Sequence, residues 1–205
     1  QGEALSKRLG TLALRDLRAQ GIAAEAVLSL MARLGSSQPV VLVNGIDQVI
    51  EGFDIGTFGS APTKFDFEDL WPLTARHYAT LEADAVKDTL DAAGVPADLQ
   101  PAFWAVVKEN IAKLDDVAPW WALFRDGGQA VVADEDRDMV AQAFDLLGEP
   151  PYTDATWGEW TNAVKEATGR KGKGLFMPLR LAVTGQARGP EMAQVMPLLQ
   201  KKPSL

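Results

Sequence analysis

The chain has 205 residues, of which 47% are hydrophobic and 23% charged, so it can bury a core of one or two domains and is not intrinsically disordered. It has no Cys and one His, which excludes disulfides, a thiol nucleophile and a metal site built from several Cys or His ligands. No apolar run approaches the ~18 residues of a membrane span and no signal peptide opens the chain, so we expect a cytoplasmic protein with no membrane partner.

The net charge of −8 is distributed unevenly along the chain. Residues 1–46, 47–166 and 167–205 carry net charges of +2, −16 and +6. A basic segment beside an acidic one can bind a polyanion through one face while the rest repels it. A soluble pair of basic helices would give the same pattern, so charge alone leaves both interpretations open.

Apolar residues at helical spacing, with Gly or Pro near most segment ends, predict an all-α fold. No alternating pattern typical of a strand extends beyond residues 40–43, and no unit of 20–50 residues repeats. A domain boundary near residues 81–86 would separate a region 1–82 from a region 83–205, and a softer boundary near residue 150 would divide the second region into 83–150 and 151–205. The expected helices cover residues 11–20, 23–34, 67–81, 83–93, 101–114, 133–147, 156–168 and 191–200, and a further short one contains residues 176–183.

The middle of the chain offers few chemical groups. His77 has no obvious carboxylate or Ser partner and is interpreted as structural. The pair Trp120-Trp121 could stack on bases, but a role in the core is the favoured reading. The acidic run 134–136 suits the N-terminus of a helix and lacks the alternating oxygen ligands of a metal loop, so we expect no metal site.

The stretch 169–190 is the most informative part of the sequence. Arg170, Lys171 and Lys173 alternate with glycines, which can bring cations and bare backbone close to a polyanion. A short helix should follow, with Pro178 in its first turn. Arg180 is the one charge inside its apolar run. It is either a surface charge or a planar donor that reads a base edge or clamps a phosphate.

Several motifs together carry a family resemblance. They are LSKRLG at 5–10, FD…F…AP…FD between 53 and 66, FWAVVKEN at 103–110, and FMPLRLAVTG at 176–185 followed by GP at 189–190. In this order they resemble the C-terminal portion of bacterial glutamyl-tRNA synthetases of the alphaproteobacterial type, from the KMSKS-like loop through the anticodon-binding domain. The resemblance covers almost all of the chain, and the catalytic Rossmann domain that precedes this portion in the family is absent from it.

The resemblance implies the activity of the full enzyme, a glutamate–tRNA ligase that uses ATP and Mg²⁺. Ser6, Lys7 and Arg8 correspond to the ATP-binding signature loop, although Ala4 stands where the family usually has a first Lys. A lysine on a mobile loop can stabilise charge on phosphoryl oxygens. With no nucleotide fold around this loop, we expect the chain alone to be inactive and to bind no cofactor.

The resemblance also implies a tRNA-binding surface. Arg180 corresponds to the arginine that reads anticodon bases, and Gly189, Pro190 and Met192 should lie near it. Region 1–82 would contact the tRNA stem. The remaining candidates for tRNA contact are Arg170, Lys171, Lys173, Lys108 and Asn110.

We therefore expect a monomer that binds a glutamate-accepting tRNA. The alternative is a non-catalytic helical interaction module or a truncated synthetase paralogue, which the missing ATP-binding fold favours for the isolated chain.

Overall fold

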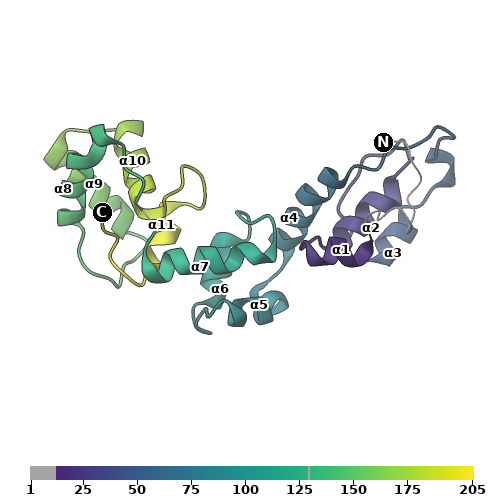
Figure 1. Ribbon diagram of the computed structural model, residues 1–205, viewed down its shortest axis with the longest axis horizontal. Helices are drawn as coiled ribbons and strands as arrows, with labels where there is room; N and C mark the ends of the chain where they lie inside the picture. Colours follow the sequence, from purple (N-terminus) through teal and green to yellow (C-terminus); the bar gives the residue numbers. More distant parts are fainter. Residues whose placement is uncertain (1–12, 129) are drawn as a thin grey trace. The chain divides into compact units, whose positions relative to one another are not determined.

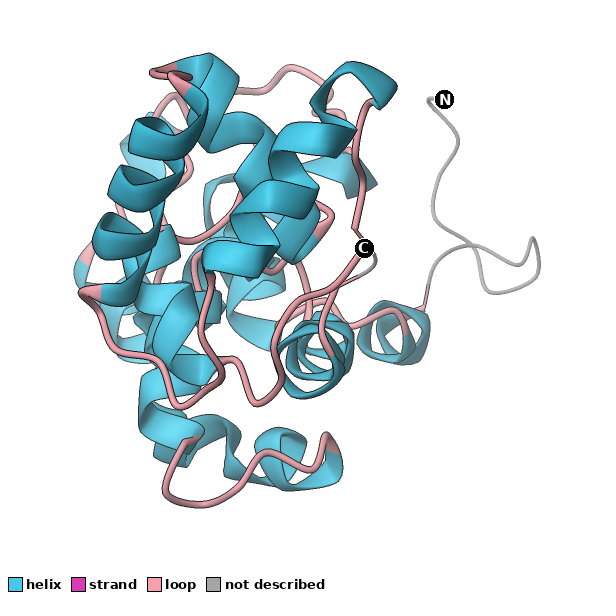
Figure 2. Cartoon of the chain, turned by 90° about the vertical axis from the view of Figure 1, so that its left-hand side faces the viewer, coloured by secondary structure: helices cyan, strands magenta, loops and turns pink. Residues whose placement is uncertain are grey.

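The computed structural model describes residues 13–128 and 130–205, and over this part of the chain it confirms the all-α prediction. Figure 1 shows the helices in chain order, and Figure 2 shows helices joined by loops without a strand. The β-type pairing in these residues is an isolated antiparallel bridge between Ser36 and Phe58. Within the same residues, no helix combines the length and apolar character needed to cross a membrane.

The chain divides into two compact units, each with its own core. The first unit ends at Leu81 but also includes the segment Ile111–Asp115, and the second contains Glu82–Asn110 and Asp116–Leu205. The second unit includes the chain on both sides of residue 150, and the helices before and after it, α8 (Arg137–Leu146) and α9 (Thr156–Thr168), pack against each other. The functional assignment of the two predicted regions stays a prediction.

The first unit is built on the packing of α2 (Ala24–Arg33) against α4 (Leu70–Thr80). Ala26 on α2 and Leu70 on α4 are completely buried, and Thr74 Oγ1 accepts a hydrogen bond of 3.2 Å from the buried Ala23 N–H. This bond satisfies one of the amide groups at the start of α2 that have no partner within the helix. The helices of this unit are α1 (Leu14–Ala19), α2 (Ala24–Arg33), α3 (Ile46–Glu51) and α4 (Leu70–Thr80), with 3-10 helices at Ile55–Thr57 and Phe67–Asp69.

Two expectations for this unit need correction. The helix expected over 67–81 is a 3-10 turn capped by Asp66, whose Oδ1 accepts from Glu68 N at 3.2 Å, followed by α4. Pro72 therefore lies in the first turn of α4, where its missing N–H removes no helical bond. His77 does have a carboxylate partner, because its Nε2 lies 3.3 Å from Glu25 Oε2 on α2. Only the packing of α2 on α4 brings these two residues together.

The core of the second unit begins with an aromatic cluster between α6 and α7. The Phe103 ring meets Trp121 and Phe124 edge-to-face, with ring centroids 5.5 and 5.7 Å apart. Trp120 and Trp121 are both buried, which confirms the favoured reading of this pair. The helices here are α5 (Lys87–Ala92), α6 (Gln100–Val107), α7 (Val117–Asp126), α8 (Arg137–Leu146), α9 (Thr156–Thr168), α10 (Lys173–Thr184) and α11 (Met192–Val195), with 3-10 helices at Ala83–Val86, Leu114–Asp116, Asp134–Asp136 and Met196–Leu198.

The expected position of Pro178 was wrong, because α10 begins at Lys173 and Pro178 lies inside it. A proline at that position cannot donate to the carbonyl four residues earlier. That carbonyl belongs to Gly174, and Arg170 Nη1 donates to it at 3.4 Å. The helix ends at Gly185, which takes the left-handed conformation that glycine adopts readily at a helix C-terminus.

We predict that Thr74→Val lowers the free energy of unfolding by about 1–3 kcal/mol, because it leaves the buried Ala23 N–H without an acceptor. Urea unfolding of the chain measures this change. The matched variant is Thr80→Val at the exposed end of the same helix, for which we expect less than about 0.5 kcal/mol. Equal losses in both variants would contradict the assigned role of Thr74.

Candidate nucleic-acid interface

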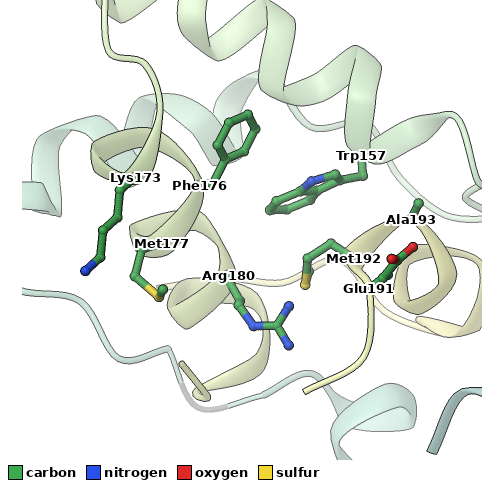
Figure 3. Close-up of a pocket in the computed structure, with 8 residues that line it drawn as sticks. All are labelled: Trp157, Lys173, Phe176, Met177, Arg180, Glu191, Met192 and Ala193. Carbon is green, nitrogen blue, oxygen red and sulfur yellow. The ribbon is translucent and has the colours of Figure 1, made fainter. Parts of the chain in front are cut away.

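A pocket of about 400 Å³ lies among α9, α10 and the start of α11. Figure 3 shows the rings of Trp157 and Phe176 beside the same open space, with the Arg180 guanidinium at its other side. The pocket thus combines flat apolar faces with cations and one carboxylate, a combination suited to an aromatic, polar ligand. Its lining residues are Trp157, Lys173, Phe176, Met177, Arg180, Glu191, Met192 and Ala193.

Arg180 is the central polar group of this pocket. Its Nη1 donates a hydrogen bond of 2.9 Å to the Pro190 carbonyl, while its Nε and Nη2 are buried and have no partner among the described residues. Burial lowers the pKa of Arg180, but a guanidinium stays charged at neutral pH. A partly buried cation with two covered, unused donors is unfavourable unless a ligand supplies acceptors, so this side chain is a candidate for ligand recognition.

Gly189 allows the loop before α11 to approach Arg180 closely. Its φ is +147°, and a Cβ at this position would lie 2.9 Å from Arg180 Nη2 and 3.2 Å from Trp120 Cη2. Any side chain here would push the guanidinium or the indole away. The structure therefore brings Arg180 to Gly189 and Pro190, as the sequence predicted, and Met192 lines the same pocket.

Lys171 and Lys173 flank the start of α10 and are both exposed. Lys173 lines the pocket, and neither lysine forms an ion pair with a described residue. Gly172 between them takes a positive φ of 58° as the N-cap of α10. Lys173 and the helix N-terminus make this edge of the pocket favourable for an anion such as a phosphate, and Lys171 adds a second positive charge two residues before Lys173.

Arg170 behaves differently from its lysine neighbours. It forms an ion pair with Asp136, and its Nη2 donates to the Glu135 carbonyl at 3.0 Å. Asp136, the last residue of the acidic run 134–136, is therefore paired, and its side chain is only 16% exposed. Arg170 ties the start of α8 to the start of α10, so its donors are already used within the protein.

The two candidates that follow α6, Lys108 and Asn110, do not line the Arg180 pocket. Lys108 Nζ lies 3.5 Å from Glu82 Oε1. Asn110 donates to the Val106 carbonyl at 3.3 Å and lines a second pocket of about 430 Å³, which Gly189 and Pro190 also border. Asn110 is thus a neighbour of the Gly189-Pro190 corner, whereas Lys108 is held by a carboxylate.

Sequence reasoning missed several residues of the pocket. The spacing of Trp157 and Trp160 predicts that both face the core, but of these two only Trp160 is buried, and Trp157 lines the pocket. Phe176 is 47% exposed although it belongs to an apolar run. Glu191 was not among the residues predicted to bind a ligand. Helical spacing cannot separate an aromatic residue in the core from one in a pocket, because both lie on the apolar face. Ser6, Lys7 and Arg8 lie outside the residues that the structure describes.

The sequence around this pocket matches a known protein family. Residues 71–205, which include every residue of the pocket, match the model of a family described as an anticodon-binding domain. The chain belongs to this family.

The similar proteins that carry names are glutamate–tRNA ligases. The chain is 63% identical to glutamate–tRNA ligase 2 of Jannaschia sp. (strain CCS1) and 64% identical to glutamate–tRNA ligase 2 of Dinoroseobacter shibae, over 100% of its own length. It spans 46% and 47% of those relatives, so about half their length. A crystal structure of a glutamate tRNA ligase from Elizabethkingia meningosepticum has the same fold, with a TM-score of 0.66 and 20% identity over 89% of this chain and 39% of that one.

We predict that Arg170→Ala lowers the free energy of unfolding by about 1–3 kcal/mol, because it breaks a charged hydrogen bond to the largely buried Asp136. Lys171→Ala is the matched variant on the neighbouring residue and should change it by less than about 0.5 kcal/mol. Urea unfolding of both variants distinguishes the two roles. If Arg170→Ala unfolds like the parent chain, the ion pair does not stabilise the start of α10.

Proposed function

We propose that the second unit binds the anticodon loop of a glutamate-accepting tRNA, and that the chain is the C-terminal, tRNA-binding part of a glutamate–tRNA ligase. Membership of the anticodon-binding family and the names of the relatives support this proposal. The observation that carries it is the Arg180 guanidinium, which has two unused, buried nitrogens beside an aromatic-lined pocket.

The chemistry of the pocket suits an unpaired base. Bases of an RNA loop can be splayed out, stacked on aromatic side chains and read on their edges. Trp157 and Phe176 offer the ring faces, and Arg180 offers planar donors. Lys171 and Lys173 at the start of α10 would hold the adjoining phosphates, which position the loop without reading its sequence.

Binding would require a small local change. Arg180 Nη1 already donates a hydrogen bond to the Pro190 carbonyl, and Nε and Nη2 are buried by the surrounding protein. We infer that the guanidinium turns or the Gly189-Pro190 corner shifts when a base arrives, so that base acceptors replace the Pro190 carbonyl. Since the covered donors are unsatisfied beforehand, the new hydrogen bonds offset the loss of the old one.

The activity of the whole protein is also a proposal. It would attach glutamate to the tRNA with ATP and Mg²⁺, in the cytoplasm and as a monomer, and Ser6, Lys7 and Arg8 would contact the nucleotide. The first unit would contact the tRNA stem, and Lys108 and Asn110 would lie near the anticodon loop. The names of the relatives and the matching motifs support these assignments.

We predict that Arg180→Ala weakens binding of a glutamate tRNA anticodon stem–loop by about 1–3 kcal/mol, because a base-reading arginine is lost. Arg180→Lys should restore little of it, since an ammonium lacks the planar fork. The measurement is fluorescence anisotropy at fixed salt. Arg125→Ala is the control, because Arg125 is exposed and paired with Asp126 outside the pocket. Undiminished binding by Arg180→Ala would favour a helical interaction module instead.

We further predict that Lys171→Ala and Lys173→Ala each reduce the salt dependence of stem–loop binding. Each lost phosphate contact should lower the slope of log K against log salt by about 0.7–0.9. Arg170→Ala should leave the slope nearly unchanged, because its charge is already paired with Asp136. A titration series in increasing salt measures all three slopes. If the lysine variants and the parent show equal slopes, Lys171 and Lys173 do not contact phosphates.

A further inference from the structure

Glu191 places a negative charge in a pocket that we propose for RNA. It lines the Arg180 pocket and also the neighbouring pocket that contains Asn110. Glu191 is the N-cap residue of α11, but its side chain accepts no capping hydrogen bond. The side chain is exposed and forms neither an ion pair nor a hydrogen bond with another described residue. Residues 167–205 carry no other acidic side chain. No ion pair or hydrogen bond among the described residues therefore accounts for the carboxylate.

A carboxylate repels phosphates and accepts hydrogen bonds without donating any. It weakens RNA binding unless a group of the RNA donates to it. The donors that a base offers to a carboxylate include its exocyclic amino group, and glutamate accepts from the N4 amino group of cytosine. A lone acidic residue at the edge of a base pocket therefore indicates selection between bases.

We infer that Glu191 is a specificity-determining residue that makes the Arg180 pocket select cytosine over uracil, an inference that rests on the proposed anticodon binding. Arg180 and Glu191 come from different elements and do not form an ion pair with each other. Figure 3 shows Met192 between their side chains in this view and the Trp157 indole beside them. A base stacked on the indole could thus meet the donor and the acceptor with one edge.

The hydrogen-bonding pattern of cytosine fits this pair. Its N3 and O2 atoms accept from the guanidinium of Arg180, and its N4 amino group donates to Glu191. Uracil in the same orientation would turn its N3–H towards the donors of Arg180 and its O4 towards the carboxylate. Both contacts would be repulsive, so the two side chains act together against uracil.

The experiment compares binding ratios instead of affinities. Anisotropy titrations at fixed salt would use the glutamate tRNA anticodon stem–loop and versions with each loop cytosine replaced singly by uracil. For the parent chain we expect one such replacement to weaken binding by about tenfold or more. In Glu191→Gln the loss should fall to about two- or threefold, because an amide can donate to O4 as well as accept.

The control is Glu166→Gln, which removes an exposed charge from α9 outside the pocket and should keep the parent's ratio. If Glu191→Gln strengthens all the RNAs equally and keeps the ratio, the carboxylate is only a repulsive charge. The inference then fails and the proposed function stands. If no replacement weakens parent binding, cytosine selection also fails. If the parent binds no stem–loop at all, both proposals fall together.

Discussion

The candidate site of the second unit depends on the position of one partly buried guanidinium, that of Arg180. Arg180 extends from α10 to the Gly189-Pro190 corner, where Gly189 also approaches Trp120, and one of its nitrogens is hydrogen-bonded. Removing such a group from water is costly, so its position must be fixed by the packing around it. Leu179 and Val183 on the same helix are completely buried, which fixes the rotation of α10 and therefore the direction of Arg180.

The glycines around this group serve the same requirement. Gly185 ends α10 in a left-handed conformation, and Gly189 brings the returning loop against the guanidinium. Without them the chain could not turn back within a few residues and place the Pro190 carbonyl at 2.9 Å. The loop thus lies close against the guanidinium, and Trp157 and Phe176 line the same pocket as Arg180.

The neighbouring cations divide into two roles through their surroundings. The planar guanidinium of Arg170 is paired with the carboxylate of Asp136. This ion pair joins the starts of two helices that are distant in sequence. Lys171 and Lys173 face solvent at the start of α10 and keep their charges available. Arg170 thus neutralises one of the negative charges of the middle of the chain, Asp136, while Lys171 and Lys173 remain positively charged at the start of α10. This arrangement lets a protein with a net charge of −8 present a local attraction for a polyanion.

Local patterns in the sequence determined the all-α fold, the span of α9 and the ends of α9 and α10, because helical periodicity and glycine conformations depend on neighbouring residues. The run FMPLRLAVTG with the following GP also pointed to the correct family. Only the tertiary structure decided that His77 meets Glu25, that Arg170 is paired, and that Trp157 lines a pocket. Those contacts join residues far apart in the chain, and their geometry follows from how the helices pack, which no local pattern encodes.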